Sequence, residues 1–157
     1  MKMRFLLALL LVVASAGPAR AQSPEHPVRT IHRLITDHDI EANRNVDFVI
    51  TADPFPSRTI VVFTGEKRAV DKARVEFVSL WFETRGKPRS DSKAFENEYQ
   101  LKEGDVVYWL PVLKELEPYM DKELRKGDLI ELYYFFMGGY SKSSRQWVFA
   151  VEEFRKL

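Results

Sequence analysis

The strongest constraint on the fold is a pair of apolar segments near the C-terminus. Residues 128–137 (DLIELYYFFM) carry apolar side chains on both faces of an alternating pattern. Residues 146–154 return with apolar side chains at every second position until Glu152-Glu153 breaks the alternation. A period of two is typical of β-strands, and the Gly138-Gly139 pair between the segments is typical of a turn. The two segments predict a C-terminal β-hairpin, around which the rest of the chain must build a sheet.

Further strands are predicted upstream of this hairpin. Residues 30–36, 46–52, 59–64 and 106–110 alternate in polarity or are rich in β-branched side chains. Residues 74–84 (RVEFVSLWFET) are apolar on both faces. Such a strand is either covered on both sides or curved into a barrel.

One main helix is predicted over residues 111–126, where apolar side chains recur at steps of three and four. Pro118 leaves two alternatives, because a mid-helix proline removes a hydrogen bond. Either the helix kinks there, or an opening turn precedes a helix that begins at Pro118. A short helix is predicted over residues 37–44, and residues 85–98 are polar enough for a long surface loop.

Two short stretches, LKEGD and LRKGD, share a glycine followed by aspartate at Gly104 and Gly127. The similarity stops at the edges of the stretches, so it does not indicate a duplicated structural unit. Each glycine precedes a predicted strand, and Gly127 follows the predicted helix. We expect both to adopt a positive φ, which glycine tolerates best.

The order of these elements resembles the OB-fold, a five-stranded partly open barrel. The resemblance covers roughly residues 46–154 and consists of three strands, a helix and a terminal hairpin, with residues 106–110 as a surplus strand. It implies an α+β, mainly β domain: a small antiparallel barrel or strongly curved sheet with one main helix before the hairpin. The alternative is a helix packed on an open antiparallel sheet.

The N-terminus predicts export. Lys2 and Arg4 precede a twelve-residue apolar stretch, and Ala19-Arg20-Ala21 supplies a small-x-small cleavage pattern. Residues 1–21 are therefore expected to be a signal peptide. Residues 22–29 are expected to be a disordered lead-in, and residues 30–157 a single β-rich domain.

The composition further restricts the location and the binding partners that the chain can have. Cleavage after residue 21 removes three basic and no acidic residues, which changes the formal net charge from +1 to −2. A near-neutral chain has no general attraction to nucleic acid. The chain contains no cysteine, which excludes a disulfide scaffold and a thiol nucleophile and fits a periplasmic or other bacterial envelope location. No later segment is long and apolar enough to span a membrane.

Few residues point to catalysis or metal binding. His32 and His38 lie near two aspartates, but no second ligand-rich segment completes a metal set. No serine-nucleophile motif or glycine-rich phosphate loop occurs, so we expect no cofactor. Glu76 and Glu131 lie inside apolar segments, where a carboxylate is either an acid–base group or one half of an ion pair.

Binding surfaces are the remaining functional signal. In a barrel of this kind, loops at 53–58 and 138–145 would present aromatic and basic side chains. The candidate ligand-binding residues are Phe55, Arg58, Tyr140, Lys142 and Arg145. We therefore expect an exported binding or structural domain of the bacterial envelope, whose partner is an envelope protein, a peptide or a glycan. The alternatives are a ligand- or oligosaccharide-binding OB-like barrel, and a small hydrolase that uses the strand carboxylates.

Overall fold

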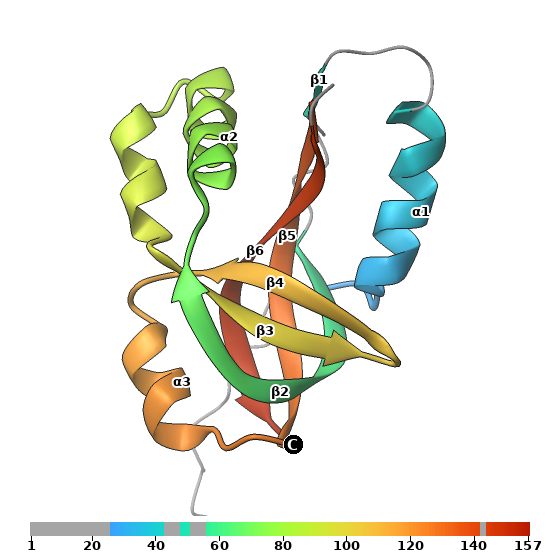
Figure 1. Cartoon of the computed structure of the whole chain (residues 1–157), viewed down its shortest axis with the longest axis vertical. Helices are drawn as coiled ribbons and strands as arrows, with labels where there is room; N and C mark the ends of the chain where they lie inside the picture. The colour runs from blue at the N-terminus through green and yellow to red at the C-terminus, as the bar shows by residue number, and fades with distance from the viewer. Residues whose placement is uncertain (1–25, 43–47, 51–55, 142–143) are drawn as a thin grey trace, which may run out of the picture.

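A closed barrel of five strands forms the centre of the computed structural model, which describes residues 26–42, 48–50, 56–141 and 144–157 (Figure 1). In chain order the elements are α1 (Ile31–Ala42), β1 (Phe48–Ile50), β2 (Ser57–Ala69), α2 (Lys72–Thr84), the 3₁₀ helix η1 (Arg89–Ala94), β3 (Asn97–Glu103), β4 (Val106–Val112), α3 (Glu117–Glu123), β5 (Leu129–Ser141) and β6 (Ser144–Lys156).

The barrel has the OB-like strand order expected from the sequence. Antiparallel pairs join β2 to β3, β3 to β4, β2 to β5 and β5 to β6. A parallel contact between Val112 of β4 and Val151 of β6 closes the circle. The helix α3 lies between β4 and β5 in the chain, ahead of the β5–β6 hairpin. The short strand β1 pairs with β5 outside the circle.

The strands that build the barrel differ from those predicted. The prediction for residues 74–84 is wrong, because they form most of α2. Residues 85–98 contain η1 and the start of β3 rather than only a loop. The segment 106–110, expected to be surplus, lies in β4 and is a barrel strand. The expected strand around 46–52 is represented among the described residues only by β1.

Two local features explain why α2 is a helix. The Asp71 side chain accepts a hydrogen bond of 2.9 Å from the backbone amide of Arg74, which caps the first turn. Phe77, Val78 and Trp81 are buried, and a spacing of one and four residues places all three on one side of a helix. On a strand Val78 would lie on the face opposite Phe77 and Trp81.

The helix α1 also replaces a different prediction, a strand over 30–36 followed by a short helix. Ile31 and Leu34 are buried at a spacing of three. Glu103 of β3 accepts hydrogen bonds of 3.0 Å from the backbone amides of Ile31 and His32. This carboxylate satisfies two of the free amides at the helix N-terminus, and it is 71 residues away from His32 in the chain.

The segment 26–29, expected to belong to a disordered lead-in, lies along the start of β2. The backbone amide of Arg58 donates to the carbonyl oxygen of Pro27 at 3.1 Å, and the carbonyl oxygen of Arg58 accepts from the amide of Arg29 at 3.0 Å.

The sequence left two alternatives for residues 111–126, and the second is confirmed. A turn comes first, and the helix α3 then starts at Glu117 with Pro118 in its first turn.

Three glycines adopt a positive φ, two at strand entrances and one inside a strand. Gly104 and Gly127 have φ angles of 58° and 95°, as expected for the entrances of β4 and β5. The C-terminal hairpin is confirmed, but the turn predicted at Gly138-Gly139 is wrong. Gly138, with a φ of 92°, lies inside β5 where the register with β6 shifts. The connection at residues 142–143 lies outside the described residues.

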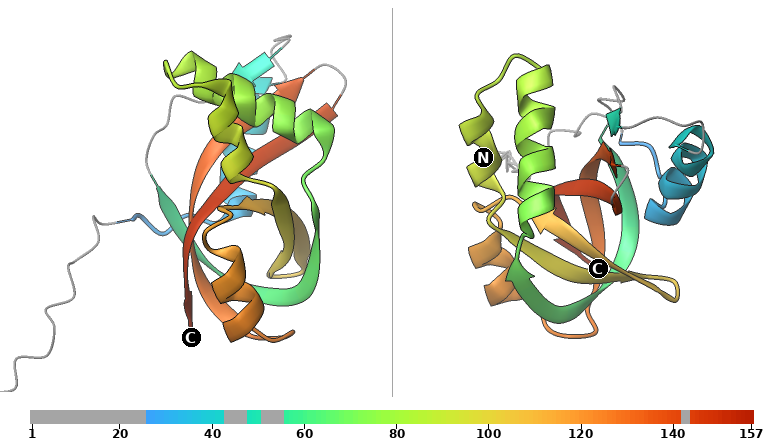
Figure 2. Two further views of the ribbon diagram at one scale, coloured as in Figure 1. Left: turned by 90° about the vertical axis from the view of Figure 1, so that its left-hand side faces the viewer. Right: turned by 45° about the horizontal axis from the view of Figure 1, so that its top comes forward.

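The described side chains form two separate hydrophobic clusters. The barrel cluster fills the interior and includes the fully buried Tyr99, Tyr134 and Phe149. The insertion cluster joins α2 and its neighbour η1 to the outer face of β5–β6, where Met137 and Val148 are buried. Figures 1 and 2 show α2 and η1 together on one side of the β5–β6 hairpin and α1 on the other. The segment inserted between β2 and β3 therefore has its own core.

Candidate functional site

A pocket of about 560 Å³ opens at the edge of the insertion cluster. Its walls come from α2, η1, the segment after β4, and strands β5 and β6. We call it the insertion pocket. Its apolar lining residues are Trp81, Phe82, Ala94, Phe95, Leu113, Phe135 and Met137. The pocket lies outside the barrel wall, which distinguishes it from the interior cavity of a ligand-carrying barrel.

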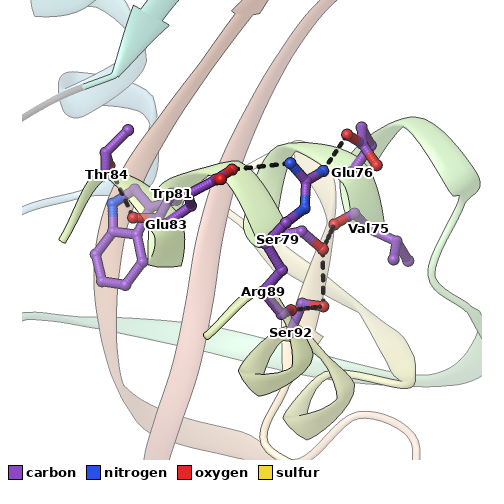
Figure 3. A network of polar contacts seen from close by, with 8 residues as sticks. All are labelled: Val75, Glu76, Ser79, Trp81, Glu83, Thr84, Arg89 and Ser92. Atoms are coloured by element: carbon purple, nitrogen blue, oxygen red, sulfur yellow. Dashed lines mark hydrogen bonds and ion pairs between the residues drawn. The ribbon is translucent and has the colours of Figure 1, made fainter. Parts of the chain in front are cut away.

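The α2–η1 wall is held together by polar contacts that Figure 3 shows. Arg89 of η1 forms ion pairs with Glu76 and, at 2.8 Å, with Glu83 on α2. On the buried side, the hydroxyl groups of Ser79 and Ser92 are 2.8 Å apart. The Ser79 hydroxyl is also 2.9 Å from the carbonyl oxygen of Val75, and the Ser92 hydroxyl is 2.8 Å from that of Arg89. Because each hydroxyl has one proton, two of these three contacts are hydrogen bonds at any time. The two helices are therefore joined on both their solvent side and their inner side.

This arrangement assigns Glu76 a structural position. Its side chain is 70% exposed and ion-paired with Arg89, on the solvent side of α2. Glu131 is buried, and its carboxylate pairs with Arg58 at 3.2 Å and Arg155 at 2.6 Å. Tyr133 also donates its hydroxyl to Glu131 at 2.8 Å. Neither glutamate is the unpaired carboxylate in a cleft that the hydrolase alternative requires.

The aromatic rings of the pocket contact one another in a chain. The ring of Trp81 lies 5.1 Å from Phe82, edge to face, and 6.4 Å from Phe135, nearly parallel. Phe82 is stacked 6.5 Å from Phe95. The Arg85 guanidinium covers one face of Trp81 at 4.0 Å. The indole Nε1 of Trp81 is buried and has no hydrogen-bond partner in the part of the chain that the structure describes.

Glu152 is the acidic group in the pocket that β6 supplies. Tyr133 pairs with Glu153 and Tyr134 pairs with Val151, so Glu152 is the extra residue of a β-bulge. Bulges redirect side chains and are common next to functional sites. Here Glu152 continues the alternation that places Val148 and Ala150 on the outer face, and the bulge then returns Phe154 to the barrel cluster.

The environment of Glu152 favours its protonated form. Burial beside the apolar pocket wall and then the charge of Glu153 raise the pKa of the Glu152 carboxyl to about 7. Neither a hydrogen bond nor an ion pair reaches this carboxyl from any described residue. Glu98, Glu117 and Glu131, which are buried, all have cationic partners. Glu152 is therefore a carboxyl whose protonation changes near neutral pH at the wall of an apolar pocket.

The pKa of Glu152 predicts a pH-dependent stability. The folded chain keeps this proton up to about pH 7, whereas the usual value is 4.5, so the parent loses stability as pH rises between these values. We expect Glu152→Gln to match the parent at about pH 4.5 and to be about 1–2 kcal/mol more stable at about pH 8, after allowing for solvent screening of a half-buried group. Denaturant unfolding of both proteins measures this difference, and a difference that is constant with pH contradicts it.

The mouth of the insertion pocket carries charges of both signs. They are Lys87, Asp91, Lys93, Lys114 and Glu115. Lys114 is paired with Glu96 at 2.7 Å, and the Lys87 ammonium lies 5.9 Å from the centre of the Phe82 ring. The rim therefore has no strong preference for one sign of charge. Glu152 differs from these exposed rim charges because it is half-buried and has no counter-ion among the described residues.

The other sequence candidates do not come together at this pocket. Arg58 pairs with Glu131 on the β2–β5 side of the barrel. Phe55 and Lys142 lie outside the described residues, and so do the side chains of Tyr140 and Arg145.

The two histidines do not form a metal site with their described neighbours. The Nδ1 of His38 is 2.7 Å from the carbonyl oxygen of Leu34, and its ring packs 4.5 Å from Phe136. His32 lies at the N-terminus of α1, where Glu103 binds its backbone amide. No group of three or more histidine, aspartate or glutamate side chains that could hold a metal occurs in the described ranges.

Sequence analysis alone missed the insertion pocket and Glu152. The wrong strand prediction for 74–84 concealed the α2 wall, so the aromatic side chains of Trp81 and Phe82 could not be placed together. A signal for Glu152 was present, because Glu152-Glu153 interrupts the alternation of the last strand. Such an interruption is what a bulge produces.

The helices described here are all too short or too polar to cross a membrane. Comparison with known proteins finds no matching family model, no matching curated protein and no matching solved structure.

Proposed function

We propose that this chain is a non-enzymatic binding domain, exported to the bacterial envelope, and that the insertion pocket holds its ligand. The observation that carries the proposal is an apolar pocket of about 560 Å³ with four aromatic rings and one half-buried carboxyl in its lining. Ligand sites are typically concave, mostly apolar and furnished with a few polar groups that orient the ligand.

The way the pocket is built supports binding rather than catalysis. Its α2–η1 wall is joined by the Arg89 ion pairs and the Ser79–Ser92 contact, so the pocket is formed by the chain's own contacts. A preformed site loses less entropy on binding. The paired carboxylates Glu76 and Glu131 serve structure, which leaves Glu152 to orient a ligand. The N-terminal apolar segment behind Lys2 and Arg4 supports the exported location.

The ligand is expected to be a small apolar group or an apolar part of a larger molecule. Benzyl alcohol, a neutral aromatic probe, should bind with a Kd on the order of 1 mM, because a ligand of this size gains little more than that. In NMR titrations it should shift the Met137 methyl and Trp81 indole signals, since both residues line the pocket.

A matched pair of variants tests the location. Leu113→Trp places a larger ring in the pocket wall and should weaken benzyl alcohol binding at least fivefold. Leu129→Trp makes the same change at a residue that is 50% exposed and outside the pocket lining, and it should not affect binding. The proposal is wrong if the probe leaves Met137 and Trp81 unchanged, or if both variants weaken it equally.

A further inference from the structure

The position of Glu152 in the insertion pocket indicates which ligands the pocket selects. We infer that the pocket binds amphipathic amines, in which an ammonium group pairs with Glu152 and an apolar body fills the space between the aromatic rings. This inference rests on the proposed function and adds the chemical class of the ligand.

The first observation is the missing counter-ion. Buried carboxylates elsewhere in the described chain are matched by the protein itself: Glu98 by Arg68 and Arg74, and Glu131 by Arg58 and Arg155. Glu152 has no such partner among the described residues, and its charged neighbour on β6 is another acid, Glu153. An unpaired carboxylate at an apolar wall is unfavourable, and a ligand cation would supply the missing partner.

The second observation is the aromatic lining. Trp81, Phe82, Phe95 and Phe135 form connected ring contacts in the pocket. Aromatic faces attract cations, and sites for organic ammonium ligands often use such faces. The chain already uses this attraction, because Arg85 covers Trp81 and Lys87 approaches Phe82.

The third observation is the placement of Glu152 on β6. It continues the alternation of Val148 and Ala150, which are buried in the insertion cluster, and therefore lies on the outer face of the hairpin, in the pocket. The β-bulge then returns Phe154 to the barrel cluster, so Glu152 is the last outer-face residue before the register shift.

An anionic amphiphile is the opposing possibility, because three lysines lie at the mouth of the pocket. Those lysines share the mouth with Asp91 and Glu115, and Lys114 is already paired with Glu96. An anionic head group would also have to approach Glu152, which adds repulsion once that carboxyl ionises. The amine is therefore the better match, and the anion is an outcome that the experiment can detect.

Three probes with the same benzyl body separate these possibilities: benzylamine, benzyl alcohol and phenylacetate, titrated at about pH 8. At this pH Glu152 is mostly ionised, and benzylamine carries its positive charge. We expect benzylamine to bind at least tenfold more tightly than benzyl alcohol, and phenylacetate to bind most weakly. The expected tenfold preference corresponds to about 1.4 kcal/mol.

Two glutamine variants identify the residue responsible. Glu152→Gln should remove the preference, so that benzylamine and benzyl alcohol bind equally, while the affinity for benzyl alcohol changes less than threefold. Glu153→Gln changes the adjacent exposed glutamate and should keep the preference. The Glu152→Gln substitution is not expected to impair folding at this pH, because the stability prediction above has the opposite sign.

The outcomes distinguish the two proposals. If benzyl alcohol binds in the pocket but benzylamine binds no more tightly, or if Glu152→Gln keeps the preference, the amine inference fails and the binding site stands. If phenylacetate binds most tightly, the ligand is an anion and the inference also fails. If none of the three probes binds, the proposed function fails together with the inference.

Discussion

Replacement of Glu98 by alanine is expected to lower the free energy of unfolding by about 3–5 kcal/mol. Glu98 on β3 has no exposed surface. Its carboxylate binds Arg68 of β2 at 2.5 Å and also Arg74 of α2, whose guanidinium donates to the carbonyl of Trp109 on β4. One carboxylate therefore connects three strands and the start of α2. Its removal leaves the Arg74 charge, which is only 13% exposed, without its main partner.

A second glutamate two residues earlier provides the control for Glu98. Glu96 pairs with Lys114 at 2.7 Å, but both side chains are at least half exposed. Exposed pairs contribute about 0–1 kcal/mol, so Glu96→Ala should change stability by no more than that. Urea unfolding of the parent and both variants measures the two differences. Similar losses in the two variants would contradict the role assigned to the buried pair.

The parts of the fold that local chemistry determines were predictable from the sequence. The positive φ of Gly104 and Gly127 followed from the conformational freedom of glycine alone. The helix start near Pro118 followed from the tolerance of the first helical turn for proline. The β5–β6 hairpin was predictable because both strands carry a long alternating pattern, although a positive φ at Gly138 serves a bulge instead of the turn.

The parts that failed depend on contacts between distant segments. An apolar run such as 74–84 fits the period of a helix and that of a strand. Here the outer face of β5–β6 offers a surface on which a helix can bury Trp81. The strand β3 (NEYQLKE) was hidden for a related reason. Its buried Glu98 looks like a surface residue until Arg68 and Arg74 are brought to it from other elements. The OB-like order was therefore predicted correctly from an element list that was partly wrong.

The candidate site shows the same limit. Its residues come from five separate segments, so no spacing in the sequence could reveal the pocket. Glu131 was a candidate acid–base residue because it lies inside an apolar strand, yet Arg58 and Arg155 neutralise its charge. Glu152 lies at a break in the pattern, where the chain has room for a bulge. Glu152 differs from Glu131 because no described residue neutralises it.

Replacement of Trp81 by alanine is expected to cost about 3–5 kcal/mol in the stability of the α2–η1 unit, as large-to-small changes of buried aromatic residues do. Trp81 is only 8% exposed and contacts Phe82 of its own helix and Phe135 of β5. It belongs to the insertion cluster, whose residues are separate from those of the barrel cluster. The loss should therefore appear first as faster opening of α2 and η1.

Trp147 supplies a matched comparison, because it is 9% exposed and belongs to the barrel cluster. Native-state hydrogen exchange of both tryptophan-to-alanine variants separates the two units. In Trp81→Ala, the amides of α2 and η1 should exchange through a low-energy opening while those of β3 and β5 keep most of their protection. In Trp147→Ala, the barrel amides should lose protection, because the barrel cluster itself is damaged. If the two variants give the same exchange pattern, the insertion and the barrel unfold as one unit and the two clusters are not independent.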